Sequence, residues 1–488
     1  MSYQSFIKRV VVLAALLVSG PASTAVANST TLRRSAVPCE SLRGLVFYNV
    51  AITDVVAVPA KGALPAYCKV SATERGTEHD LEIRLPDRWR ERYVQHGGGG
   101  FDGRILPMEP NEPALLAAAV QGANNGGHRD WTGAALRNNP RALERYAHGA
   151  ILTATRFGKA VTQAYYGRPA KYSYYEGCSN GGRGALNAAA KYGTEFDGVV
   201  AAAPTMNASG QIAAWTRAAN LQLPSAAQFA QIHGAAVSQC DALDGAKDGV
   251  IAAWNRCAFD PSKDIPASVG LTPLQVVAIR TLMADLKRED GSVVYSGYGL
   301  GDLAFGAQLF AFLGTGHFRN IIGRDLTWTP AGFEPIAELP HISAVIDGQY
   351  QFSAAVPDLV QYVQRGGRII VWHGSDDDIV SHRDTIRTWA DVTATAGAAL
   401  AERGLRFYIA PGVAHCRGGP GADDIDALTP LMNWVEHGSA PQTLMATKRD
   451  PKSGASLFTR PLCRYPAYPR YAGKGDMNAA ANFTCVAD

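Results

Sequence analysis

One serine of the sequence lies in a setting that could make it a nucleophile. Ser179 is the centre of Gly177-Cys178-Ser179-Asn180-Gly181, which fits the pattern G-x-S-x-G. Residues 172–176 before it are strand-like, and residues 185–191 after it favour a helix. A sharp turn between the two would push the serine oxygen out of the backbone, and the flanking glycines would let the chain approach closely. A serine at a helix N-terminus is otherwise only a cap, but this setting favours a nucleophile.

A nucleophilic serine needs a general base and a carboxylate that orients the base, and both are available later in the chain. The strand-like residues 368–372 lead into His373-Gly374-Ser375-Asp376-Asp377-Asp378, so one of these three carboxylates is expected to be the acid. The next strand-like run, residues 405–409, leads into a loop with His415, which we expect to be the base. His373 is the competing histidine, and we assign it to the support of the acidic loop.

A glycine-rich run could supply the hydrogen-bond donors that stabilise an oxyanion. His96-Gly97-Gly98-Gly99-Gly100 follows the strand-like residues 93–95 and begins a formal G-x-G-x-x-G. A dinucleotide site would need a helix at these glycines, but residues 106–110 contain two prolines that disfavour one. We therefore expect the backbone N–H of Gly98 or Gly99, together with that of Asn180, to form an oxyanion hole.

These candidate residues all follow strand-like runs, which indicates a sheet that positions them. Short apolar runs alternate with alanine-rich helical stretches over residues 81–210 and again over residues 368–434, a pattern typical of α/β proteins. Residues 208–350 lack this alternation and hold clustered aromatics, glycine and proline. We predict one α/β domain formed by residues 28–207 and 351–488, with residues 208–350 inserted as a lid.

The composition is that of a globular protein and argues against several classes of partner. Hydrophobic residues make up 47% and charged residues 18% of the 488 residues, so a packed core is expected. The formal net charge is only +3 and no long basic run is present, so nucleic acid is not expected as a partner. No segment reaches the roughly 20 apolar residues of a spanning helix, so no membrane anchoring is expected either. The composition predicts no particular oligomeric state.

The N-terminus has the features of a cleaved signal peptide. Lys8 and Arg9 precede the apolar run Val10–Val18, and small residues then lead to Ala25-Val26-Ala27. We predict that residues 1–27 are removed and that the protein, of bacterial origin, is secreted or periplasmic.

Export would bring the chain into an oxidising compartment, and its eight cysteines form an even set without zinc-binding spacing. Disulfides are therefore expected, although the count does not fix their connectivity. Short separations favour the pairs Cys39 with Cys68, Cys240 with Cys257, and Cys463 with Cys485, which leaves Cys178 and Cys416.

Three runs of the chain resemble the tannase and feruloyl esterase family. Gly177 to Arg183 is similar to its G-C-S-x-G-G-R signature, Ala164-Tyr165-Tyr166-Gly167 to its A-Y-Y-G element, and residues 196–201 to its F-D-G-I-V-A strand. The resemblance covers most of the mature chain and implies an α/β-hydrolase fold with a large inserted lid. It places the acid of an H-G-x-x-D motif at Asp377 and the base, in an H-C pair, at His415.

The same resemblance implies a disulfide between Cys178 and Cys416. Such a bridge would make Ser179 and His415 neighbours, because it holds its two Cα atoms within about 4.4 to 6.8 Å. A free catalytic cysteine at position 178 is the competing interpretation, which export disfavours.

The run from Cys240 to Ile251 places three carboxylates on a glycine-punctuated loop, as a calcium site requires. It lacks the terminal glutamate of an EF-hand. The resemblance implies a structural Ca²⁺ held by the side chains of Asp241, Asp244 and Asp248 and by the backbone carbonyls of Ala246 and Val250. A set of Asx turns on a polar loop is the alternative.

The resemblance implies a serine esterase that hydrolyses a small aromatic ester through an acyl-enzyme, with feruloyl-type hydroxycinnamoyl groups as the expected acyl part. A tannase and a terephthalate half-ester hydrolase are alternatives within the family. A secreted binding protein on the same scaffold is a remote alternative, whose sign would be a broken triad. Four lid aromatics are candidates to pack the substrate ring, with a core role as the alternative for each: Phe312, Phe318, Trp328 and Phe333.

Two segments depart from the family pattern. The chain has Asn125-Gly126-Gly127-His128 where the family often has D-T-G-H, and residues 347–358 also differ.

Overall fold

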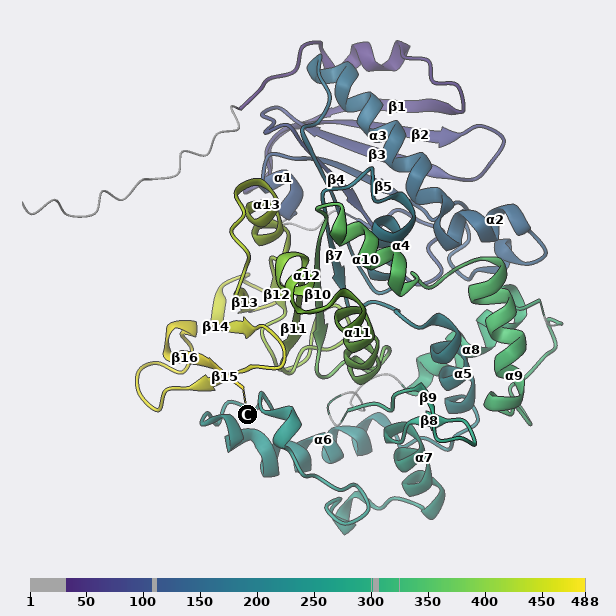
Figure 1. Ribbon diagram of the computed structural model, residues 1–488, viewed down its shortest axis with the longest axis vertical. Helices are drawn as coiled ribbons and strands as arrows, with labels where there is room; N and C mark the ends of the chain where they lie inside the picture. The colour runs from purple at the N-terminus through teal and green to yellow at the C-terminus, as the bar shows by residue number, and fades with distance from the viewer. Residues whose placement is uncertain (1–31, 108–111, 300, 302–306, 324, 488) are drawn as a thin grey trace, which may run out of the picture. The chain divides into compact units, whose positions relative to one another are not determined.

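The computed structural model describes residues 32–107, 112–299, 301, 307–323 and 325–487, and Leu32–Asp488 form one compact unit. The predicted signal peptide, residues 1–27, lies outside the described residues. Figure 1 shows the order of the elements.

A nine-stranded sheet is the framework of the fold, with the strand order β1-β2-β3-β5-β4-β6-β7-β10-β11. Its strands are β1 Val50–Val58, β2 Tyr67–Glu74, β3 Asp80–Pro86, β4 Arg92–His96, β5 Val120–Asn124, β6 Tyr172–Cys178, β7 Gly198–Ala202, β10 Arg368–Gly374 and β11 Leu405–Ala410. Neighbours run parallel from β5 to β11, whereas β1, β2, β3 and β5 pair antiparallel. The four strands expected before the candidate site residues are thus β4, β6, β10 and β11.

Helices cover both faces of this sheet, because its parallel strands are apolar on both sides. Ile369 of β10 packs in a core with helices on one face, and the adjacent Ile370 packs in a second core on the other face. The helices of the two blocks are α1 Pro113–Leu116, α2 Pro140–Glu144, α3 Ala150–Tyr166, α4 Asn180–Tyr192, α10 Val356–Gln364, α11 His382–Ala396, α12 Ala398–Gly404 and α13 Leu428–His437. This layered arrangement is that of an α/β-hydrolase.

The segment between β7 and α10 contributes no strand to the large sheet among its described residues. Its elements are α5 Ala208–Ala218, α6 Ala226–Cys240, α7 Pro273–Met283, β8 Leu286–Lys287, β9 Val293–Tyr295, α8 Ala307–Asn320 and α9 Pro335–Ser343 (Figure 1). Their buried residues share one core with Phe101 and Tyr146 of the first block. The exact domain division, with residues 208–350 as a separate lid, stays a prediction.

Three of the four lid aromatics pack against one another. Phe318 is fully buried and stacks on Trp328 at 4.5 Å between ring centroids, with Phe333 at 5.2 Å from Phe318. The core role therefore holds for these three, and Phe312 alone of the four lines the cavity described below.

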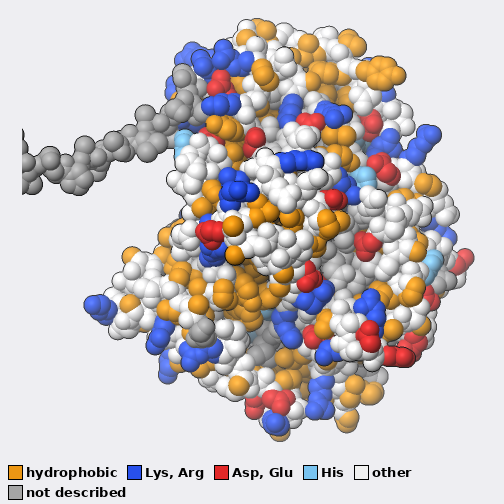
Figure 2. Space-filling model, in the orientation of Figure 1, with side chains coloured by type: hydrophobic (Ala, Val, Ile, Leu, Met, Phe, Trp, Pro, Cys, Tyr) orange, Lys and Arg blue, Asp and Glu red, His pale blue; other side chains and the backbone are white. Residues whose placement is uncertain are grey.

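Four disulfides join the eight cysteines in the expected pairs, Cys39–Cys68, Cys178–Cys416, Cys240–Cys257 and Cys463–Cys485. The last of these links two small C-terminal sheets, whose strands are β12 Asp424–Ile425, β13 Thr443–Arg449, β14 Ser456–Cys463, β15 Tyr468–Tyr471 and β16 Phe483–Val486. Among the described helices, none is both long and apolar enough to cross a bilayer. Figure 2 shows basic and acidic side chains interspersed over one face rather than gathered into a stripe.

Candidate active site

Ser179 lies at a strained turn between strand β6 and helix α4. Its backbone has φ 62° and ψ −124°. Residues other than glycine rarely adopt this conformation, which costs about 1–3 kcal/mol. A Cβ on Gly181 would lie 2.5 Å from the carbonyl oxygen of Gly98, and one on Gly177 would lie 2.6 Å from the Gly181 carbonyl. Both flanking positions therefore require glycine, as the G-x-S-x-G pattern indicates, and the turn presents the serine oxygen to the neighbouring loops.

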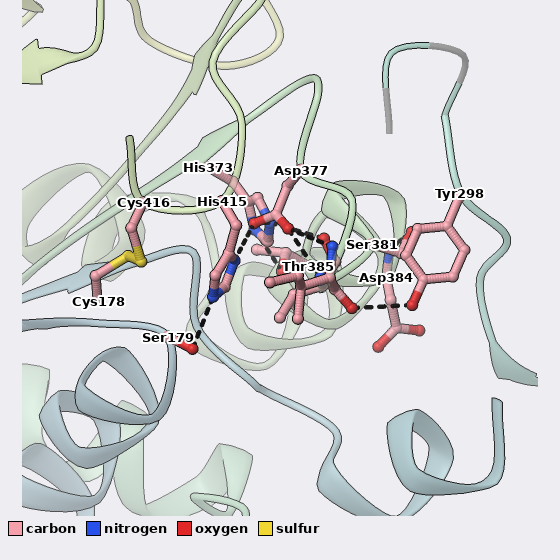
Figure 3. Close-up of polar contacts among 12 residues, drawn as sticks. Cys178, Ser179, Tyr298, His373, Asp377, Ser381, Asp384, Thr385, His415 and Cys416 are labelled. Atoms are coloured by element: carbon pink, nitrogen blue, oxygen red, sulfur yellow. Dashed lines mark hydrogen bonds and ion pairs between the residues drawn. A yellow bond between two sulfur atoms is a disulfide. The ribbon is translucent and has the colours of Figure 1, made fainter. Parts of the chain in front are cut away.

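The candidate acid and base come from the loops after β10 and β11 and meet Ser179 in a row (Figure 3). Nε2 of His415 lies 2.7 Å from Oγ of Ser179, and Nδ1 of His415 lies 2.8 Å from Oδ2 of Asp377. A carboxylate can only accept, so Nδ1 of His415 carries the proton and Nε2 is left to accept the serine proton. The structure thus brings together the three residues that the sequence proposed.

The acid and the base shift each other's pKa values in opposite directions. Burial alone would raise the pKa of Asp377, but His415 and His373 hold it well below its usual range. Burial disfavours the protonated form of His415, yet the Asp377 carboxylate raises its pKa above the ordinary value. Asp377 therefore stays ionised and favours the proton that His415 takes up.

The other groups around Asp377 fix its position. The backbone N–H groups of Ile379 and Val380 donate to Oδ1 at 2.9 and 2.8 Å, and Nε2 of His373 lies 3.0 Å from Oδ2. His373 also contacts Thr385 at 3.0 Å, so it supports the acidic loop, which is the role assigned to it from the sequence.

Neither flanking aspartate takes the place of Asp377. Asp376 accepts a hydrogen bond from Ser375 at 2.8 Å and lies 3.2 Å from His233. Asp378 is buried, and burial together with Asp377 raises its pKa to about 6. The hydrogen-bond geometry therefore selects the middle carboxylate of the three.

The Cys178–Cys416 disulfide joins the residue before Ser179 to the residue after His415, with its Cα atoms 5.9 Å apart. Figure 3 shows the bridge directly beside the serine–histidine contact. It ties the end of β6 to the loop after β11, which are separated by 238 residues in sequence.

The glycine loop after β4 borders the same site. Gly99, Asn180 and Ser179 line one cavity, and a backbone contact of Gly99 with the carboxylate of Asp102 lowers the pKa of that carboxyl. Gly99 and Asn180 are therefore the candidate oxyanion donors that border the cavity, whereas Gly98 does not line it.

A polar network behind this loop was not predicted from the sequence. Asn180 donates to Asp102 at 2.9 Å, and Arg183 donates to Asn180 at 2.7 Å and to the carbonyl oxygens of Ala147 and Tyr146. Burial raises the pKa of Asp102 to about 6, against the hydrogen bond from Asn180. The arginine of the G-C-S-x-G-G-R signature was the available signal, because a buried guanidinium must have several acceptors.

The network also explains one departure from the family pattern. A Cβ at Gly126 would lie 2.3 Å from the Asp102 carboxylate, and Gly126 has φ +74°. The threonine of D-T-G-H would therefore collide with Asp102, and glycine is required at this position.

A cavity of about 320 Å³ opens beside Ser179 and His415. Its polar side chains include Gln211 and His317, which no sequence pattern had singled out. The aromatic residues of its wall are Phe101, Trp131, Tyr146, Trp215, Phe312 and Phe352. An aromatic ring of a ligand would meet apolar and π surface here.

The inserted segment reaches the acidic loop itself. The indole N–H of Trp215 and the hydroxyl of Tyr298 both donate to the carbonyl oxygen of Ile379, at 2.8 and 2.9 Å. The segment between the sheet blocks therefore helps to fix the loop that carries Asp377.

In the expected calcium loop, backbone N–H groups donate hydrogen bonds to the three carboxylates. Asp244 accepts from the N–H of Ala246 at 2.9 Å and Asp248 from that of Val250 at 3.1 Å, both as Asx turns. Asp241 accepts from the N–H groups of Asp248 and Gly249, and Arg460 donates to Asp248. Burial and the two neighbouring carboxylates raise the pKa of Asp244 to about 7, which indicates buried negative charge that a cation would compensate.

Comparison with known proteins gives consistent results over most of the chain. The family model described as tannase and feruloyl esterase matches residues 68–308 and 342–486. A probable feruloyl esterase of Arthroderma benhamiae is 31% identical, over 83% of this chain and 82% of that protein. The mono(2-hydroxyethyl) terephthalate hydrolase of Piscinibacter sakaiensis is 30% identical, over 93% of this chain and 92% of that protein.

Solved structures share the fold. Feruloyl esterase B from Aspergillus oryzae superposes with a TM-score of 0.80 at 24% identity, covering 92% of this chain and 99% of that one. Tannin acyl hydrolase from Aspergillus niger gives a TM-score of 0.75 at 21% identity, covering 94% of this chain and 97% of that one.

Proposed function

Because the chain belongs to the tannase and feruloyl esterase family, whose members are carboxylic ester hydrolases, we propose that it hydrolyses aromatic esters through an acyl-enzyme on Ser179. One observation carries the proposal: an unbroken row of hydrogen bonds from Ser179 through His415 to Asp377, opening on a cavity with aromatic walls.

The row of hydrogen bonds accounts for each proton in the reaction. Oγ of Ser179 attacks the ester carbonyl while Nε2 of His415 accepts its proton, and ionised Asp377 stabilises the imidazolium. The N–H groups of Gly99 and Asn180 hold the oxyanion. His415 then returns the proton to the leaving alcohol, and a water molecule repeats the sequence to release the acid and free serine.

Hydroxycinnamoyl esters are the substrates that we propose first. The aromatic wall suits a planar acyl group, and the named relatives include feruloyl esterases. The guanidinium of Arg183, which lines the cavity, is already bound to Asn180 and to backbone carbonyls. Its hydrogen bonds within the protein leave it poorly placed to bind a substrate carboxylate. We therefore rank terephthalate half-esters after hydroxycinnamoyl esters as substrates.

Two further parts of the proposal concern the protein rather than the reaction. We propose that Asp241, Asp244 and Asp248, with the carbonyls of Ala246 and Val250, hold a structural Ca²⁺, supported by the buried charge at Asp244. We also propose export, supported by four disulfides, which persist in oxidising compartments.

Hydrolysis of methyl ferulate, methyl gallate and a terephthalate half-ester by the purified protein tests the proposal. We expect turnover to be highest for the ferulate and a fluorophosphonate probe to label Ser179, as seen by peptide mass spectrometry. Ser179→Ala should abolish turnover and labelling, and Asp377→Asn should lower kcat by about 10⁴. The matched control is Asp391→Asn, at an exposed position on α11. Labelling at another serine, or turnover by Ser179→Ala, would contradict the proposal.

A further inference from the structure

One histidine on the cavity wall has a hydrogen-bonding nitrogen that the fold does not use. His317 on α8 is 9% exposed and lines the cavity beside Ser179. Its Nδ1 lies 2.7 Å from the carbonyl oxygen of Leu313, and no partner of Nε2 exists among the described residues. Nε2 is not among the fully buried atoms that lack a partner, so it is accessible, and a ligand in the cavity that His317 lines can hydrogen-bond to it.

The hydrogen bond to Leu313 decides what Nε2 can offer. A carbonyl oxygen can only accept, so Nδ1 of His317 must carry a hydrogen. Burial lowers the pKa of His317 to about 4, with Arg183 adding to the effect, so the ring is neutral near pH 7. A neutral ring protonated on Nδ1 has a lone pair on Nε2. Nε2 is therefore an acceptor, and a ligand group that meets it must donate.

Neighbouring side chains define the kind of ligand that brings this donor. The His317 ring lies 4.8 Å from the ring of Phe101 and 5.6 Å from that of Trp215, measured between centroids. These rings also line the cavity, so the acceptor is set within an aromatic wall. A planar ring that carries a hydroxyl group would satisfy both the wall and the acceptor.

A second polar side chain on the same wall lacks a partner. Gln211 is 1% exposed and lines the cavity from α5, one helical turn before Trp215. Neither the oxygen nor the nitrogen of its amide has a hydrogen-bond partner in the described structure. An amide both donates and accepts, as a hydroxyl does, so a rotation of this side chain toward the cavity would add a second contact to the same group.

We propose that His317 is a specificity residue whose Nε2 accepts a hydrogen bond from a hydroxyl group on the aromatic part of the ester. The inference rests on the proposed esterase function. A carboxylate on the ring would place its lone pairs against that of Nε2, so the site discriminates against it. Arg104, the other arginine that lines the cavity, is exposed, and a preference for a carboxylate would point to Arg104 instead.

Three methyl esters that differ only on the ring test this role: cinnamate, 4-hydroxycinnamate and 3,4-dihydroxycinnamate. We expect wild-type kcat/KM to be about tenfold to a hundredfold higher for at least one hydroxylated ester than for plain cinnamate, mainly through KM. His317→Phe keeps a ring but removes the acceptor, and it should abolish this ratio while plain cinnamate changes less than about threefold. His317→Gln, which has an amide oxygen, should restore part of the ratio.

The matched control is His341→Phe, at an exposed position on α9, which should keep the wild-type ratio. Equal losses on all three esters in His317→Phe would show a purely structural role and overturn the proposal. A wild-type enzyme that turns over the three esters equally would also overturn it, even if the variants fail to fold. No turnover of any ester by the wild type would contradict the esterase function itself, which separates the two failures.

Discussion

At the scale of single residues, three consecutive aspartates show how position decides chemistry. Asp376, Asp377 and Asp378 have the same side chain, but one contacts a lid histidine, one is ionised between two histidines, and one is buried beside a like charge. The sequence pattern pointed to the loop whose carboxylate meets His415, because a carboxylate after a sheet strand is recognisable. The choice among the three needed the family resemblance, because it depends on side-chain directions that spacing does not encode.

The pH dependence of the reaction should report the charge beside the base. His415 must be neutral to accept the serine proton, and Asp377 raises its pKa, so kcat/KM should fall as pH drops through a value above 6.5. The carboxylate of Asp378 also raises that pKa. Asp378→Asn removes a negative charge that favours the imidazolium, so the acid limb should move to lower pH while activity at pH 8 changes little.

A pH profile of methyl ferulate hydrolysis from pH 4 to 9 measures this shift. Asp391→Asn, an exposed aspartate on α11, is the charge-matched control and should leave the limb in place. If the acid limb of Asp378→Asn stays at the wild-type pH, or moves to higher pH, the claim that Asp378 raises the pKa of His415 is wrong.

At the scale of elements, the parallel strands were predictable and the edges of the sheet were not. The apolar runs at β4, β6, β10 and β11 are buried along most of their length, so their pattern is strong. Strand β1 has an irregular register between Ile52 and Asp54 and several exposed residues, so it lacks a clean alternation. The contact of Asp102 with Asn180 joins the loop after β4 to the first residue of α4, which lies far away in sequence, so no local pattern reveals it.

The disulfide between the end of β6 and the loop after β11 should set the distance from nucleophile to base. Cys178→Ala with Cys416→Ala should lower kcat by on the order of a hundredfold in protein that remains folded, because a misplacement of about 1 Å has that effect. The matched control is Cys463→Ala with Cys485→Ala, which removes a bridge between C-terminal strands. It should lower the Tm and leave kcat nearly unchanged.

Steady-state kinetics alongside thermal unfolding separate the two effects. Equal kcat losses in both double variants would mean that the active-site bridge acts on stability alone. Peptide mapping without reduction checks that the wild-type bridges are those described.

At the scale of the whole molecule, the loop from Asp241 to Val250 connects buried charge to stability. The pKa of Asp244 is raised to about 7 in the folded chain, against 3.8 as its ordinary value. A group whose folded pKa is raised in this way favours folding when protonated, and its contribution is lost as pH rises between about 4 and 7. Bound Ca²⁺ would cancel that loss by neutralising the carboxylates.

Thermal unfolding at pH 7.5 with a chelator and with millimolar Ca²⁺ tests this coupling. The wild-type Tm should rise by a few degrees with Ca²⁺, whereas Asp244→Asn, which keeps the oxygen that accepts from Ala246, should not respond. In the chelator the variant should melt no lower than the wild type, because it removes a buried charge. Asp290→Asn, an exposed aspartate of the same segment, should respond like the wild type. If Ca²⁺ still raises the Tm of Asp244→Asn, Asp244 does not bind the ion. The loop would then be only a set of Asx turns.

The bridge that spans 238 residues also implies an order of events in time. Ser179 leaves the ribosome before the whole inserted segment, and Asp377 and His415 follow only after that segment. A serine without its base is a poor nucleophile at neutral pH. A nascent chain would therefore be inert toward esters until β10 has paired with β7 and β11 with β10, so activity would begin only after both strands have been made and have folded.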